Sequence, residues 1–252
     1  MRERIAKMKK MFVTDKVQKA HWQQPEDPYC LAREFADQKL WDVERSAKRL
    51  LYVLEKETPV IFPEERIAFT RTVQTIPEIF TEEEMEELRR EHWIHEKGDV
   101  CNICVDYTKL LGKGLIPQKE ELELLRQGFL RGEEQEKARY VELQIAILDG
   151  VLELAERYKS KARKTGNHTV AQTLERVPAQ VPETFLEALQ MFRILHFTMW
   201  CGRNYHNTVG RFDQYMYPFL KRDLERGVLT KEDALELLEE FFLTFNRDSD
   251  LY

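Results

Sequence analysis

Apolar residues recur at intervals of three or four along most of the chain, which is the spacing of helices with one buried face. This periodicity predicts helices over residues 28–57, 119–130, 133–164 and 234–245. The segment after residue 184 is apolar nearly all round, which predicts an interior helix. Residues 59–71 carry β-branched side chains and are broken by proline, so we expect an extended or looped segment there.

Three threonines mark expected helix starts. Thr81, Thr184 and Thr230 each stand three positions before a Glu or Asp, the arrangement of a capping box. We expect them to open a short acidic helix, the interior helix and the final helix. Gly and Pro are scarce, at 10 and 9 of 252 residues, which favours helices joined by short loops. The sequence therefore predicts a mainly α fold.

Charge and composition narrow the classes of partner. The net charge is −6 and the pI is about 5.7, which argues against nucleic acid, because binding phosphates needs clustered basic residues. Residues 1–10 are charged throughout and form no secretory signal. The longest apolar run, residues 191–200, contains Arg193 and His196 and is far shorter than the roughly 20 residues that span a bilayer. The 4 cysteines are few for this length and are interpreted as reduced thiols. Together with the missing signal and the short apolar run, they predict a cytoplasmic protein without a membrane partner.

One pattern suggests a metal. His92 and His95 share a helix face, and Cys101 and Cys104 follow as a Cys-x-x-Cys pair, which can hold Zn²⁺. Only 5 residues separate the two pairs, however, which does not fit a zinc finger. We therefore expect no metal ligands here and favour surface histidines with packed thiols. A small metal-binding helical module stays as an alternative.

A polar segment lies between the interior helix and the apolar helix that follows it. Residues 200–218 (WCGRNYHNTVGRFDQYMYP) concentrate ionisable and amide side chains beside apolar stretches, where polar groups are costly unless they are paired or used. In the structural interpretation, Arg211 pairs with Asp213 and Asp213 caps the next helix. In the functional interpretation, the segment binds a ligand. Spacing alone leaves both open.

Three segments in order resemble the glycyl radical enzymes, the pyruvate formate-lyase-like superfamily. They are residues 105–122 (VDYTKLLGKGLIPQKEEL), 176–197 (RVPAQVPETFLEALQMFRILHF) and 209–246, which opens with VGRFDQYMYP. The form GRFDQYMYP resembles the dehydratase, decarboxylase and other eliminase-like branches more than pyruvate formate-lyase itself.

The resemblance implies a fold and a truncated function. Family members form a ten-stranded α/β barrel wrapped in helices, so we expect residues 1–252 to be the helical N-terminal portion of that barrel, with few strands. We divide it into a helical region, residues 1–175, and a connector with the substrate-side motif, residues 176–252. In the family, a thiyl Cys loop and a glycyl loop lie downstream of the last matched helix. No cysteine here matches the thiyl motif, so we expect no catalytic residue and no activity from this chain alone.

The resemblance also assigns candidate binding residues. Asp213 matches the family carboxylate that accepts a hydrogen bond from a substrate hydroxyl, and Tyr205 matches a position that lines the pocket in some eliminases. Arg211 is a candidate for binding a substrate carboxylate bidentately, or for a structural partner of Asp213. His206 and Asn207 complete the candidate set in this loop.

A sixth candidate is Asn102, on the earlier matched segment. Many family members carry a His four residues before the Asp that matches Asp106, and that His orients the substrate. Asn102 stands at that position and exchanges no proton near pH 7, although its amide can donate or accept a hydrogen bond. Any proton transfer must therefore come from another group.

These features lead to one main hypothesis and one further alternative. The main hypothesis is the substrate-side portion of a glycyl radical lyase that cleaves a C–C or C–X bond in a small polar metabolite. The alternative is a non-catalytic paralogue or interaction subunit that binds a partner radical enzyme. Expected partners are a small-molecule substrate, a complementary C-terminal piece or a second copy, and an activating enzyme. That activating enzyme, which uses S-adenosylmethionine and an iron–sulfur cluster, installs the radical on a region absent here, so we expect no cofactor in this chain.

The final helix also predicts an exposed apolar patch. Seven large apolar side chains fall within eleven residues on differing faces of this helix: Leu235, Leu237, Leu238, Phe241, Phe242, Leu243 and Phe245. In the family, later barrel strands cover such a helix. We therefore expect a patch larger than a soluble monomer usually exposes.

Overall fold

The structure, a computed structural model, describes residues 3–91, 103–204 and 207–248. Within these ranges every regular element is helical, and no residue is in a strand. The α-helices are α1 (Glu3–Lys9), α2 (Cys30–Asp37), α3 (Asp42–Lys56), α4 (Glu82–Arg90), α5 (Tyr107–Leu111), α6 (Leu115–Arg131), α7 (Gln135–Thr165), α8 (His168–Thr173), α9 (Phe185–Cys201), α10 (Phe212–Glu225) and α11 (Lys231–Thr244). A π-helical turn, η1 (Lys10–Thr14), and two 3₁₀ turns, η2 (Val17–His21) and η3 (Phe245–Arg247), complete the set.

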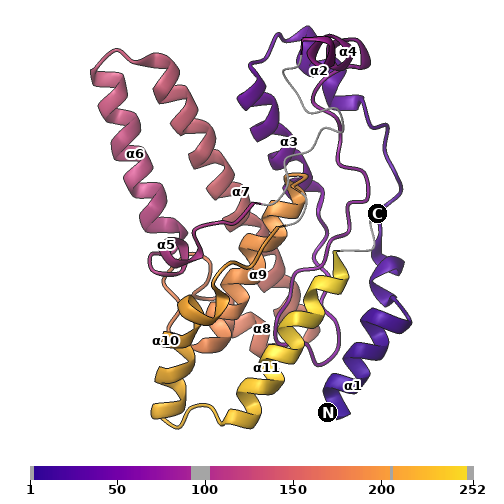
Figure 1. Cartoon of the computed structure of the whole chain (residues 1–252), viewed down its shortest axis with the longest axis vertical. Coiled ribbons are helices and arrows are strands. Elements are labelled where there is room, and N and C mark those ends of the chain that lie inside the picture. The colour runs from indigo at the N-terminus through magenta and orange to yellow at the C-terminus, as the bar shows by residue number, and fades with distance from the viewer. Residues whose placement is uncertain (1–2, 92–102, 205–206, 249–252) are drawn as a thin grey trace.

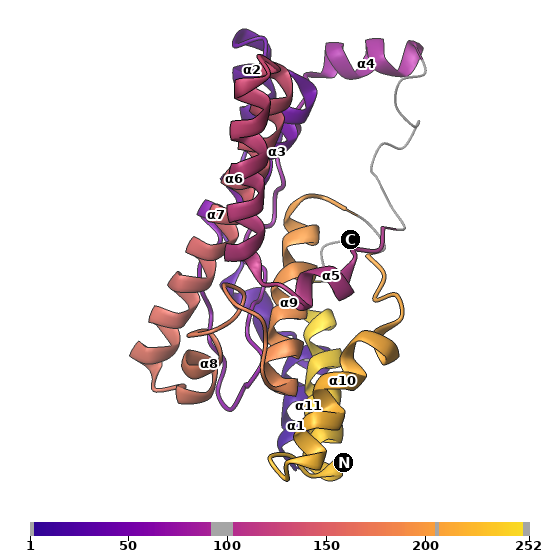
Figure 2. The same cartoon turned by 90° about the vertical axis from the view of Figure 1, so that its left-hand side faces the viewer.

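The helices gather around α9. Helices α6 and α7 form a long antiparallel hairpin that α3 packs against, and α10, α11 and α1 lie at the opposite end of the molecule (Figures 1 and 2). Helix α1 runs alongside α11, so the two ends of the described chain lie on the same side. Helix α4 buries no residue and stands away from the body (Figure 2).

Helix α9 fills the centre because its sequence is apolar on every side. Its side chains at Phe185, Leu189, Phe192 and Phe197 are all fully buried in the main core. The prediction of an interior helix is confirmed. Even the charged Arg193 of this helix is completely buried.

The looped segment at residues 57–73 crosses the interior, where backbone groups need partners. Side chains supply many of them. The Glu57 carboxylate accepts hydrogen bonds from the backbone amide and hydroxyl of Thr72, at 2.7 and 2.6 Å, and the amide of Ala68 donates to Gln190 at 2.8 Å. The Tyr158 hydroxyl accepts from the Thr70 amide and donates to the Thr70 carbonyl. Burial raises the pKa of Glu57 to about 6.

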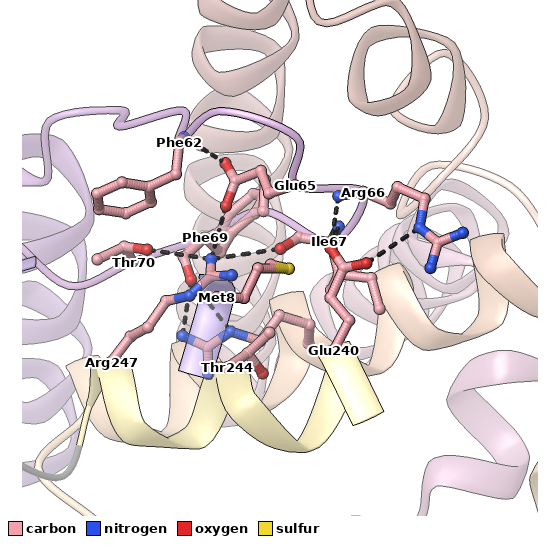
Figure 3. Close-up of polar contacts among 12 residues, drawn as sticks. Met8, Phe62, Glu65, Arg66, Ile67, Phe69, Thr70, Glu240, Thr244 and Arg247 are labelled. Atoms are coloured by element: carbon pink, nitrogen blue, oxygen red, sulfur yellow. Dashed lines mark hydrogen bonds and ion pairs between the residues drawn. The ribbon is translucent and has the colours of Figure 1, made fainter. Parts of the chain in front are cut away.

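A network of ion pairs around the buried Glu240 carboxylate joins this segment to the last helix (Figure 3). The Glu240 carboxylate accepts from the backbone amides of Arg66 and Ile67 and from the guanidinium of Arg66. Arg4 of α1 donates to the same carboxylate at 2.8 Å. Helix α1 is therefore held to α11 by ion pairing as well as by apolar packing.

Two further ion pairs are fully buried. The Arg247 guanidinium lies 2.8 Å from the Glu65 carboxylate and stacks over the Phe12 ring, and Figure 3 shows it beside Thr70. Arg193 donates to both carboxylate oxygens of Asp248 and to a backbone carbonyl. Buried charges of this kind persist only when each one is paired.

Most expected helices form, with boundaries that differ in detail. Thr81 and Thr184 make complete capping boxes, whereas Thr230 accepts from the Asp233 amide without the reciprocal backbone bond. The single helix expected over residues 28–57 is wrong, because it is interrupted between Asp37 and Asp42. Among the described residues, no helix is long and apolar enough to cross a membrane.

Substitutions at two glycines test how closely the backbone is packed in this fold. Gly114 has a positive φ of 79°, and an added Cβ would lie 2.7 Å from the backbone carbon of Gln180. We expect Gly114→Ala to lower the free energy of unfolding by at least about 2 kcal/mol, because the alanine would strain the backbone at this φ and its Cβ would clash with Gln180. Gly128, inside α6 with open space around it, is the control: Gly128→Ala should raise stability by about 0.5–1 kcal/mol. Urea denaturation of both variants checks this, and equal effects would contradict the described backbone.

Candidate functional site

The candidate binding residues Asp213 and Arg211 lie at the start of α10. Their side chains are 73% and 70% exposed, and the Arg211 Nε lies 3.4 Å from an Asp213 oxygen. The hydrogen bond from Arg211, reinforced by backbone amides of the first turn, lowers the pKa of Asp213. The carboxylate is therefore ionised at neutral pH and open to solvent.

The structural interpretation of this pair is confirmed in one respect and wrong in another. Arg211 does pair with Asp213, as expected. Asp213 is not the N-cap of α10, however, because that position falls on Arg211, which makes no side-chain capping bond. Asp213 instead lies in the first turn, where a negative charge is favoured by the helix dipole.

A close approach of two segments sets the position of this helix start. The Thr208 amide donates to the Ile103 carbonyl at 2.9 Å, so the chain before α5 runs beside the loop before α10. Gly210 has a positive φ of 58°, and an added Cβ would lie 2.7 Å from the Cys104 sulfur. A glycine is thus required immediately before Arg211, in a motif that sequence reasoning identified only as a family pattern.

The candidate loop is the segment between α9 and α10, residues 202–211, and its described residues make local polar contacts. The Asn204 side chain donates to the Met199 carbonyl at 3.1 Å, and the Asn207 side chain donates to the Asn204 carbonyl at 3.0 Å. The Asn207 carbonyl lies 3.4 Å from the Nε2 of His196, which is on α9. Of the candidate residues, Asn207 therefore contacts the protein interior, whereas Asp213 and Arg211 face solvent.

An aromatic layer lies beneath the loop and the first turns of α10. Tyr107 of α5 stacks on Phe192 of α9 at 4.1 Å between ring centroids, and Tyr215 and Phe212 of α10 pack on the same ring. The Tyr215 hydroxyl donates to the Val209 carbonyl. This layer fixes the helix that carries Asp213.

The other predicted residues have different outcomes. Tyr205, His206 and Asn102 lie outside the described residues, so their binding roles stay predictions. The same holds for His92, His95 and Cys101 of the metal pattern. Within the described ranges, no group of three or more His, Cys, Asp or Glu side chains is arranged to hold a metal, and Cys30, Cys104 and Cys201 are free thiols.

Two hollows occur elsewhere on the surface. One of about 520 Å³ lies between residues 61–66 and 165–169, and another of about 490 Å³ lies in the groove between α6 and α7. Neither is lined by Asp213 or Arg211. Asp213 and Arg211 are instead exposed to solvent at the start of α10.

Comparison with known proteins identifies the family. The family model described as pyruvate formate lyase-like matches residues 78–251, more than two thirds of the chain. The chain belongs to the pyruvate formate lyase-like family of glycyl radical enzymes. The matched range includes the connector, α9, the candidate loop, α10 and α11.

Curated relatives match the chain at moderate identity. The chain is 29% identical over 170 residues to a trans-4-hydroxy-L-proline dehydratase of Clostridioides difficile, a match that covers 61% of this chain and 21% of that protein. It is 29% identical over 179 residues to an isethionate sulfite-lyase of Bilophila wadsworthia, covering 64% and 20%. The matched part is therefore about a fifth of each relative's length.

Solved structures confirm the fold. A Roseburia inulinivorans structure described by its 1,2-propanediol dehydration matches 99% of this chain with a TM-score of 0.76, at 20% identity and 38% coverage of that chain. A B12-independent glycerol dehydratase of Clostridium butyricum matches 99% with a TM-score of 0.73, at 17% identity and 41% coverage. The expectation of a helical N-terminal portion of this fold is confirmed.

Proposed function

We propose that this chain forms the substrate-side portion of a glycyl radical lyase that acts on a small polar metabolite. Family membership supports the class of enzyme. The site supports the role: Asp213 is an ionised, solvent-facing carboxylate on a helix start that the aromatic layer holds in place. That carboxylate is the observation on which the proposal depends.

The two exposed side chains fit two parts of one small molecule. An ionised carboxylate accepts a hydrogen bond from a hydroxyl, and a guanidinium binds a carboxylate or sulfonate bidentately. The substrates named for two relatives, trans-4-hydroxy-L-proline and isethionate, each carry a hydroxyl and an acidic group. In our proposal, Asp213 orients the hydroxyl and Arg211 orients the anionic group of a related compound.

In the proposed function, the residues described here act on the substrate by binding and orientation rather than by radical chemistry. In the family a thiyl Cys and a glycyl radical supply it, and no cysteine here stands in the thiyl motif. In our proposal, the residues of this chain bind and orient the substrate. We therefore expect no glycyl radical doublet in electron paramagnetic resonance when the chain is incubated with an activating enzyme and S-adenosylmethionine. A doublet from this polypeptide would contradict the proposal.

Ligand binding tests the substrate-side role directly. We expect saturation-transfer NMR to detect binding of trans-4-hydroxy-L-proline or isethionate to the unmodified chain. Asp213→Asn should weaken it by at least about ten-fold, because it removes a hydrogen bond to a charged acceptor. Asp149→Asn, at a half-exposed aspartate on α7, is the matched control and should change nothing. Equal binding by both variants, or no binding by the unmodified chain, would contradict the proposed role.

A further inference from the structure

His196 lies directly beneath the candidate loop and has no role in the proposed function so far. Its side chain is on α9 and the residue is only 4% exposed. The Phe245 ring lies 4.7 Å away between centroids, and Phe192 and Trp200 pack on either side along α9. The imidazole is therefore fixed in one orientation by aromatic contacts from α9 and η3.

The single polar contact described for this ring defines its protonation state. Nε2 lies 3.4 Å from the Asn207 carbonyl, and a carbonyl oxygen only accepts, so Nε2 must carry the hydrogen. Nδ1 is buried and has no hydrogen-bond partner among the described residues. A hydrogen on Nδ1 would be buried without an acceptor, which is costly, so the ring is the neutral Nε2–H tautomer.

The charges around the ring agree with this state. Arg193, one turn earlier on α9, and Asp248, just after η3, are the charged groups that act on it. Burial and Arg193 lower the pKa of His196 to about 4, and Asp248 and the Asn207 carbonyl oppose them only in part. Because Arg193 and Asp248 pair with each other, the pair as a whole has no net charge that would favour an imidazolium.

We propose that His196 is a positioning residue for the candidate loop: its Nε2–H holds the Asn207 carbonyl and fixes the backbone that leads to Arg211 and Asp213. This extends the proposed function, because the loop matters only if it carries the binding residues. The neighbouring Thr208 amide, bonded to the Ile103 carbonyl, reports the position of the loop without any ligand.

Hydrogen exchange of the Thr208 amide tests the proposal in three variants of the full chain. His196→Phe keeps a ring but loses the donor, so Thr208 should exchange at least about five-fold faster. His196→Gln places an amide N–H near the position of Nε2 and should restore most of the protection. His168→Gln, at an exposed histidine, should leave the rate unchanged. Equal protection in His196→Phe and the unmodified chain would overturn the proposal, as would faster exchange in both His196 variants.

The tautomer gives a second measurement that does not depend on a variant folding. Long-range ¹H–¹⁵N NMR of the imidazole should show the Nε2–H form, unchanged between pH 7.5 and about 5.5. An Nδ1–H tautomer or an imidazolium in that range would overturn the assignment. Asp213→Asn distinguishes failure of this proposal from failure of the proposed function. It should weaken ligand binding and leave Thr208 protected, because Asp213 does not contact His196. If the unmodified chain binds no ligand, the proposed function fails, and exchange in the His196 variants still decides the role of His196 in the loop.

Discussion

Glu240→Ala should lower the free energy of unfolding by about 3–5 kcal/mol, the range measured when one partner of a buried ion pair is removed. The carboxylate is completely buried and accepts hydrogen bonds from the backbone amides of residues 66 and 67 and from the Arg66 guanidinium (Figure 3). A fourth hydrogen bond comes from the Arg4 guanidinium. Removing it leaves both cations and both amides without this acceptor. Urea denaturation followed by circular dichroism measures the loss.

The neighbouring position provides the control. Glu239 is on the same helix and partly exposed, so Glu239→Ala should cost less than about 1 kcal/mol. Glu240→Gln, which keeps the volume and removes the charge, should fall between the two. Arg4 and Arg66 also pair with Glu236, at 2.7 and 3.2 Å. A Glu240→Ala loss below about 1 kcal/mol would show that Glu236 is a sufficient partner for both and that α1 does not depend on the Glu240 carboxylate.

Local features of this fold were predictable because their causes lie within a few residues. The capping boxes at Thr81 and Thr184 require only a side chain and a backbone amide three positions apart. The interior position of α9 follows from its own composition. The break near residue 38 was missed because apolar spacing continues through the short loop between α2 and α3, where Lys39 adopts a positive φ of 52°.

Other features depend on pairs that are far apart in the sequence. Nothing in the first ten residues indicates that Arg4 pairs with a glutamate 236 positions later. The same applies to Arg247 and Glu65, separated by 182 positions. Each partner, seen alone, has the residue type of a solvated surface charge, and only the tertiary fold removes it from water.

In the candidate site, too, local motifs were predictable and long-range contacts were not. Asp213 was identified from its motif, and the structure adds its exposure and its pairing with Arg211. His196 was visible only as a histidine in an apolar run, a signal that fits a packed core side chain equally well. Its contact with Asn207 depends on how the loop folds back over α9, which neither periodicity nor motif spacing encodes.

The apolar patch expected on the final helix is narrower than the sequence indicates. Leu237 and Phe241 are buried in the core. What remains is a stripe: Leu235 is 58% exposed and Phe242 is 46% exposed, with Leu238 and Phe245 half-buried between and beyond them. Because the stripe lies along one face, its spacing of three, four and three residues matches the seam of a helix pair.

We expect the chain to self-associate through this stripe, or to be soluble only with a complementary C-terminal piece. Sedimentation velocity should show a concentration-dependent dimer, and a hydrophobic dye should bind to the monomer. Leu235→Glu combined with Phe242→Glu should weaken association by at least about ten-fold, because an unpaired charge would be buried in the contact. Leu124→Glu is the control, since Leu124 is 67% exposed on α6, away from the stripe.

The geometry of the stripe predicts how two copies would pair. In an antiparallel pair about a two-fold axis near residue 240, Leu235 faces the partner's Phe245 and Leu238 faces the partner's Phe242, so each contact is made twice. Either single Glu substitution therefore places two charges in one dimer and should weaken it more than a one-sided contact would. A monomer with no affinity for the dye would contradict the prediction. Association lost in Leu124→Glu but kept in the double variant would move the contact to the hairpin of α6 and α7.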